Sequence, residues 1–132
     1  MDCGAAGMRG LLIDDNTEIT DMMGQFLTLH GYDCTISNNA EEGLQQILNK
    51  NYDFVLLDMA MPEISGIDVI ESLEKRGELT KQKIIVLTAS AITDEELADL
   101  LIRGVSKCLK KPIDLNRLLD VIKSCTGSIM MN

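Results

Sequence analysis

Residues 54–58 read Phe-Val-Leu-Leu-Asp, four apolar residues in succession followed by a carboxylate. A strand covered on only one face alternates apolar and polar residues, whereas a parallel strand covered on both faces is apolar throughout. This stretch therefore predicts a central parallel strand with Asp58 at its carboxyl end. The apolar runs at 11–13 and 84–87 have the same character.

Helical patterns separate these runs. Between residues 19 and 27 the apolar side chains recur at the spacing of one helix face, and a similar pattern follows each later run. Weaker strands are expected at 32–37 and from about 105 to 110, and Asn39, Thr93 with Glu96, and Asp114 are suited to begin helices. Five strand–helix units predict an α/β domain built on a doubly wound parallel sheet.

Composition narrows the class of protein. A chain of 132 residues suits one domain, and its net charge of -9 disfavours direct binding to nucleic acid. The four cysteines are scattered, without zinc spacing, and are expected to be reduced thiols of a cytoplasmic protein. No apolar run approaches the roughly 18 residues of a membrane span, so no membrane insertion is expected.

Polar residues collect where the predicted strands end. Asp14-Asp15 follow the first strand, Asp58 ends the third, Thr88 ends the fourth, and Lys110-Lys111 end the fifth. Each alone is more often a turn, a helix cap or a solvated surface residue. Ligands of doubly wound sheets bind outside the carboxyl ends of the strands, so their joint placement predicts one site.

These carboxylates, the hydroxyl and the lysine suit the binding of a metal ion and the transfer of a phosphoryl group. Crowded carboxylates raise one another's pKa unless a cation joins them, and Mg²⁺ accepts few carboxylates together with water and phosphate oxygens. Asp58 could act as a carboxylate nucleophile that forms an acyl phosphate. A lysine would offset charge on the transferred group, and the hydroxyl of Thr88 could bond to one of its oxygens.

The chain from Met8 to Cys125 resembles the response-regulator receiver family of two-component signalling. The resemblance is carried by an ordered set of stretches: Asp14-Asp15, Leu56-Leu57-Asp58-Met59-Ala60-Met61-Pro62, Gly66, Leu87-Thr88-Ala89, and Gly104 through Lys111-Pro112. It implies a flavodoxin-like (βα)5 fold with the strand order 2-1-3-4-5. It also implies a cis peptide bond before Pro112, where the residue type permits one.

The resemblance further implies a role for each site residue. Asp58 is expected to accept the phosphoryl group, with Thr88 as the switch hydroxyl and Lys111 as the lysine that contacts the phosphoryl group. Mg²⁺, with Mn²⁺ as a substitute, is expected to be bound by Asp14, Asp15, Asp58 and the backbone carbonyl of Ala60.

The same resemblance implies partners and domain limits. A sensor histidine kinase or phosphotransfer protein is expected to donate the phosphoryl group, and a downstream output protein or domain to receive the signal. The protein is then a phosphoacceptor switch and not a turnover enzyme. Residues 8–125 are expected to form the receiver, after a flexible leader or cloning remnant at 1–7 and before a short C-terminal tail at 126–132.

Three positions depart from the family pattern. Cys108 stands where relatives carry an aromatic residue on the fifth strand, so rotation of an aromatic ring cannot report phosphorylation here. Ala60 and Ser90 flank the expected phosphoryl site with small side chains, which leaves the lifetime of the phosphoryl group open.

Three other functions were weighed against the receiver. A haloacid-dehalogenase-like phosphatase requires a second Asp two residues after its nucleophile, where this chain has Ala60. A flavodoxin-like nucleotide or flavin binder would place a phosphate loop after the first strand, where Asp14-Asp15 would repel phosphate. A degenerate receiver that serves only as an interaction module would not need the complete set of acidic residues and lysine.

Overall fold

The computed structural model of the protein describes residues 7–60 and 65–127. Strands and helices alternate along this part of the chain, as the sequence predicts. In chain order the elements are β1 (Arg9–Ile13), α1 (Thr17–Leu29), β2 (Asp33–Ser37), α2 (Ala40–Asn49), β3 (Phe54–Asp58), α3 (Gly66–Lys75), the 3₁₀ turn η1 (Leu79–Lys81), β4 (Ile84–Thr88), α4 (Asp94–Arg103), β5 (Lys107–Lys110) and α5 (Leu115–Thr126).

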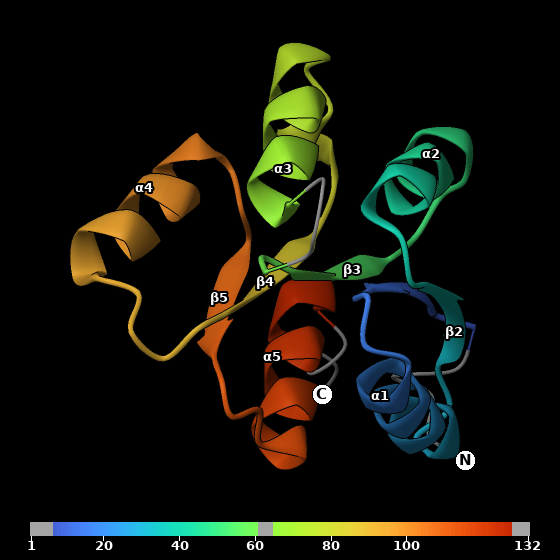
Figure 1. The fold of residues 1–132 in the computed structure, drawn as a ribbon. Coiled ribbons are helices and arrows are strands. Elements are labelled where there is room, and N and C mark those ends of the chain that lie inside the picture. Colours follow the sequence, from blue (N-terminus) through green and yellow to red (C-terminus); the bar gives the residue numbers. More distant parts are fainter. Residues whose placement is uncertain (1–6, 61–64, 128–132) are drawn as a thin grey trace.

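The five strands form one sheet in the order β2-β1-β3-β4-β5, and every neighbouring pair is parallel. Helices α2, α3 and α4 cover one face and α1 and α5 cover the other, as Figure 1 shows. The side chains of β3 and β4 are buried along their whole length, because helices cover both faces there. The predicted fold class and strand order are therefore confirmed.

Two strands begin later than their sequences predict. The apolar residues Tyr32 and Val105 are buried, but each donates its backbone N–H back to the preceding helix, to Leu27 at 3.1 Å and to Leu100 at 3.1 Å. These bonds satisfy carbonyl groups that a helix leaves unpaired at its end. Both residues therefore belong to helix ends, and β2 and β5 begin at Asp33 and Lys107.

Helix starts follow the predicted signals. Asn39 and Asp114 cap α2 and α5, and Thr93 and Glu96 form the predicted capping box of α4. A second capping box, between Ser65 and Asp68 at the start of α3, was not predicted. Within the described part of the chain, no helix has the length and apolar character to cross a membrane.

Candidate functional site

The strand register brings the predicted site residues to one edge of the sheet. Ile13 pairs with Leu57 on β3, so Asp14 lies beside Asp58, and Thr88 pairs with Lys110 on β5. Asp14, Asp58 and Thr88 are each only 2% exposed. Burying two carboxylates side by side costs free energy unless positive charge or hydrogen bonds offset it.

The three acidic residues form a compact cluster. Carboxylate oxygens of Asp14, Asp15 and Asp58 all lie within 4.8 Å of one another. One oxygen of Asp14 accepts a hydrogen bond from the backbone N–H of Asn16 at 2.9 Å. Its other oxygen is buried and has no hydrogen-bond partner among the described residues. A buried acceptor without a donor, on one of three clustered carboxylates, suits the binding of a cation.

This environment changes the ionisation of Asp14. The pKa of Asp14 rises from 3.8 to about 6, chiefly because the carboxyl group is buried, and the negative charges of Asp58 and Asp15 act in the same direction. The hydrogen bond from Asn16 and the charge of Lys111 lower it only in part. The site therefore holds its negative charge at an energetic cost.

The side chain of Lys111 contacts the acidic cluster. The ammonium nitrogen of Lys111 lies 2.7 Å from an oxygen of Asp58, and Asp58 has a side chain only 2% exposed. The backbone N–H of Lys111 donates to the carbonyl of Thr88 at 2.8 Å, which fixes the lysine to the end of β4. Lys110 is exposed. The peptide bond between Lys111 and Pro112 is cis, as expected.

The hydroxyl of Thr88 lies toward β5. It donates to the carbonyl of Leu109 at 3.5 Å, the upper limit for a hydrogen bond. Cys108, one residue earlier on β5, is half-buried and packs against the core between the sheet and α2–α4. Because its bond to Leu109 is weak, the hydroxyl of Thr88 remains available for a stronger acceptor.

Sequence reasoning missed two residues that hold the acidic loop in place. The side-chain amide of Asn38 donates to the carbonyl of Asp14 at 2.7 Å and to the hydroxyl of buried Thr20 at 3.1 Å. Asn38 lies 24 residues after Asp14, at the end of β2. No local signal in the sequence could have linked them, because the contact depends on the pairing of β1 with β2.

Gly66 allows α3 to begin against the site. A Cβ atom at this position would lie 2.6 Å from the carbonyl oxygen of Asp58 and 2.8 Å from the Cα atom of Met59. Any side chain would push α3 away from the end of β3. Met61 and Pro62, in the same predicted motif, lie outside the described residues.

The donor set fits a hard divalent cation. The cluster offers carboxylate oxygens alone, one of them buried without a partner, and it is open to solvent at Asp15. Mg²⁺ prefers such oxygen ligands and keeps water on its open side. Ala60 is exposed two residues beyond Asp58.

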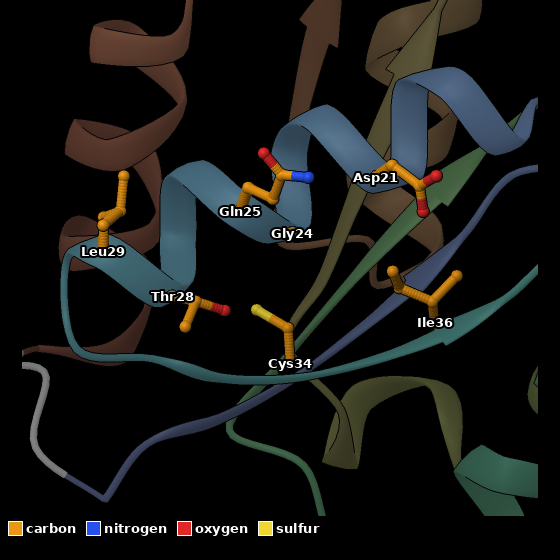
Figure 2. A pocket seen from close by; sticks show the side chains of 7 residues that line it. All are labelled: Asp21, Gly24, Gln25, Thr28, Leu29, Cys34 and Ile36. Atoms are coloured by element: carbon orange, nitrogen blue, oxygen red, sulfur yellow. The ribbon is translucent and has the colours of Figure 1, made fainter.

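A hollow of about 430 Å³ lies away from the acidic cluster, between α1 and β2. Figure 2 shows Cys34 of β2 pointing toward Thr28 of α1, and Ile36 of β2 lying below the stretch of α1 that contains Gly24. Burial raises the pKa of the Cys34 thiol to about 11, so the sulfur is not a nucleophile at neutral pH.

Residues 11–123 match the sequence profile of the response regulator receiver domain. The chain is 34% identical over 114 residues to the transcriptional regulatory protein CpxR homolog of Haemophilus influenzae, covering 86% of this chain and 48% of that protein. It is 32% identical to the phosphate regulon transcriptional regulatory protein PhoB of Pseudomonas aeruginosa, covering 86% and 49%. The chain thus spans about half the length of these curated relatives.

Solved structures of response regulators are similar to this chain as well. The receiver domain of the Francisella response regulator 1452 superposes with a TM-score of 0.84 at 24% identity, covering 93% of this chain and 99% of that one, which supports the fold. The response regulator TrrA of Thermotoga maritima, solved in complex with Mg²⁺ and BeF, is 30% identical with a TM-score of 0.75, covering 89% and 98%. The chain therefore belongs to the response regulator receiver domain family of two-component signalling.

Proposed function

We propose that Asp58 accepts a phosphoryl group from a phosphohistidine of a sensor histidine kinase or phosphotransfer protein. The observation that carries the proposal is the setting of Asp58. Its buried carboxylate lies between the carboxylates of Asp14 and Asp15 and the ammonium group of Lys111, which is 2.7 Å away. Buried carboxylates held beside a lysine at the carboxyl edge of a parallel sheet suit phosphoryl transfer.

The transfer needs one bond to form and one to break. An oxygen of Asp58 attacks the phosphorus, and the phosphorus–nitrogen bond of the phosphohistidine breaks with its electron pair going to the imidazole, which then takes up a proton. The product is an acyl phosphate on Asp58. The side-chain nitrogen of Lys111 lies next to the transferred group, where it would donate to the phosphoryl oxygens and offset their negative charge.

Asp14, Asp15, Asp58 and the backbone carbonyl of Ala60 would hold a divalent cation. When bound, Mg²⁺, or Mn²⁺ in its place, supplies positive charge against the phosphoryl oxygens. The buried oxygen of Asp14, which has no hydrogen-bond partner in residues 7–60 and 65–127, supports this assignment, as does the Mg²⁺–BeF complex of the Thermotoga relative.

Phosphorylation would act as a switch. Three phosphoryl oxygens offer Thr88 a stronger acceptor than the carbonyl of Leu109 at 3.5 Å, so the hydroxyl turns toward Asp58 and draws the following loop inward. Cys108 is small and leaves room for that movement. Water then hydrolyses the acyl phosphate and resets the protein, which is a switch and not a turnover enzyme.

The wider setting is also a proposal. Receiver residues 8–125 would carry the signal from a kinase to a downstream output protein or domain in the cytoplasm. The net charge of -9 disfavours direct contact of this domain with nucleic acid.

The acceptor can be identified directly. Incubation with a small phosphodonor and Mg²⁺ should add one phosphoryl group to wild type, mapped to Asp58 by mass spectrometry. The Asp58→Asn protein should gain none, because an amide is not a nucleophile here. The Asp120→Asn protein, changed at an exposed acid on α5, serves as the matched control. A phosphoryl group on any other residue would contradict the proposal.

Without metal, the ionised carboxylate of Asp14 should lower the free energy of unfolding. Its pKa of about 6 lies above the ordinary 3.8, so its carboxylate destabilises the fold above pH 6, where folded and unfolded chains are both ionised. This loss of stability becomes smaller as the pH falls, and it disappears below about pH 4, where the carboxyl group is protonated in both the folded and the unfolded chain. Asp14→Asn should therefore stabilise the protein by about 2–3 kcal/mol at pH 7 and hardly at all near pH 4, as measured by urea unfolding with a chelator. A gain independent of pH would count against this assignment.

Magnesium should stabilise the folded protein in proportion to its binding. A tenfold excess over Kd adds about 1.4 kcal/mol to the free energy of unfolding, visible as a rise in Tm. Asp15→Ala should lose most of this rise, because Asp15 contributes to the cluster while remaining exposed. The Asp120→Ala protein should keep it, and an unchanged rise in Asp15→Ala would remove Asp15 from the site.

The two adjacent lysines provide a matched pair. Lys111→Ala should weaken binding of beryllofluoride, a phosphoryl analogue, by on the order of tenfold or more, since it removes a charge-assisted hydrogen bond. Lys110→Ala should leave the affinity within about twofold, because an exposed charge contributes little. Isothermal titration calorimetry with Mg²⁺ present measures both. The reverse result would mean that Lys110 contacts the phosphoryl group.

A further inference from the structure

A groove runs between the N-terminal ends of α3 and α4, beside the acidic cluster. Its volume is about 430 Å³. Its apolar lining consists of Met59, Ile67, Ile92 and Leu100, and its carboxylates are Glu95, Glu96 and Asp99.

The groove arises from the way α4 is attached. Leu100 is the only residue of α4 that is buried. Near the C-terminal ends of the two helices, the guanidinium of Arg103 makes a two-pronged contact with Glu74 of α3, at 2.8 and 3.3 Å. The helices are therefore joined at their C-terminal ends, and their N-terminal ends leave the groove between them.

Charge and apolarity together define what fits this groove. Three of the seven residues that line it are acidic, and none of these seven is basic. Two hydrogen bonds from Thr93, the first from its backbone N–H, lower the pKa of Glu96, which is therefore ionised at neutral pH. Asp99 makes a long contact of 3.6 Å with Arg103. An apolar floor with an anionic rim complements a segment that carries both apolar and basic side chains.

The floor of the groove is attached to the phosphorylation site proposed above. Met59 follows Asp58 directly, and its backbone N–H donates to the carbonyl of Leu87 at 3.1 Å. Ile92 belongs to the turn that follows Thr88, where its N–H donates to Ala89 at 3.2 Å. Movement of the loop after Thr88 would therefore displace one wall of the groove relative to the other.

We propose that this groove docks a basic amphipathic segment of a partner protein, and that the state of Asp58 sets its affinity. The docking part depends only on the shape and charge of the groove. The dependence on Asp58 rests on the proposed function.

A synthetic peptide tests the docking. The probe is a fluorescent amphipathic helical peptide with leucines on one face and lysines on the other, and its binding is followed by fluorescence anisotropy. Glu95→Lys/Asp99→Lys should weaken binding by on the order of tenfold. The control Glu41→Lys/Asp120→Lys makes the same change in net charge at exposed helix positions elsewhere and should change the affinity by less than about twofold.

Two results would overturn docking. Equal weakening by both double variants would mean that the peptide is attracted to the acidic chain in general. Unchanged binding of a peptide with serines in place of leucines would mean that the apolar floor plays no part. Both double variants should melt as cooperatively as wild type by circular dichroism, because all four positions are exposed.

Beryllofluoride tests the dependence on Asp58. With Mg²⁺ present, it should change the peptide affinity of wild type by at least about threefold and leave that of Asp58→Asn unchanged. Equal affinity with and without beryllofluoride, in a protein that mass spectrometry shows to be phosphorylated on Asp58, would overturn the coupling. If Asp58 takes no phosphoryl group and the contrast between the double variants persists, the proposed function fails and the docking stands.

Discussion

The carboxylate of Asp58, buried at the end of β3 beside Asp14, is the constraint on which the rest of the site depends. Two buried acids repel each other, and water is excluded from most of their surface. Lys111 offsets part of this charge at 2.7 Å, and the buried oxygen of Asp14 still lacks a donor among the residues described. Further positive charge at this edge would therefore be favourable, and the dianionic phosphoryl group proposed for Asp58 would depend on it.

The parallel sheet is what makes such a cluster possible. Parallel strands place all their carboxyl ends at one edge, so residues 14, 58, 88 and 111 meet there although they are far apart in the sequence. The helices on both faces keep that edge rigid, with β3 and β4 buried throughout. Asp58 and Thr88 are the last residues of β3 and β4, and Asp14 and Lys111 lie in the loops that directly follow β1 and β5, so the apolar strands hold all four in position.

Rigidity is uneven across the domain. The central strands β3 and β4 are buried throughout, whereas α4 contributes a single buried residue and is joined to α3 by Arg103 and Glu74. Elements with few buried contacts are those that can shift at low cost. The part of the molecule that can move therefore adjoins the proposed phosphoryl site, where a change of charge has the largest effect.

The sequence by itself determined the fold class and the composition of the site. Continuous apolar runs predict buried parallel strands, and polar residues at their ends predict which side chains gather there. The strand order and the separate roles of the two lysines came from the resemblance to receivers. The structure set the starts of β2 and β5, where Tyr32 and Val105 bond back to the C-terminal ends of the preceding helices instead of extending the strands. It also decided the contact of Asn38 with Asp14 and the groove beside α4, because these depend on segments that meet only after the sheet has formed.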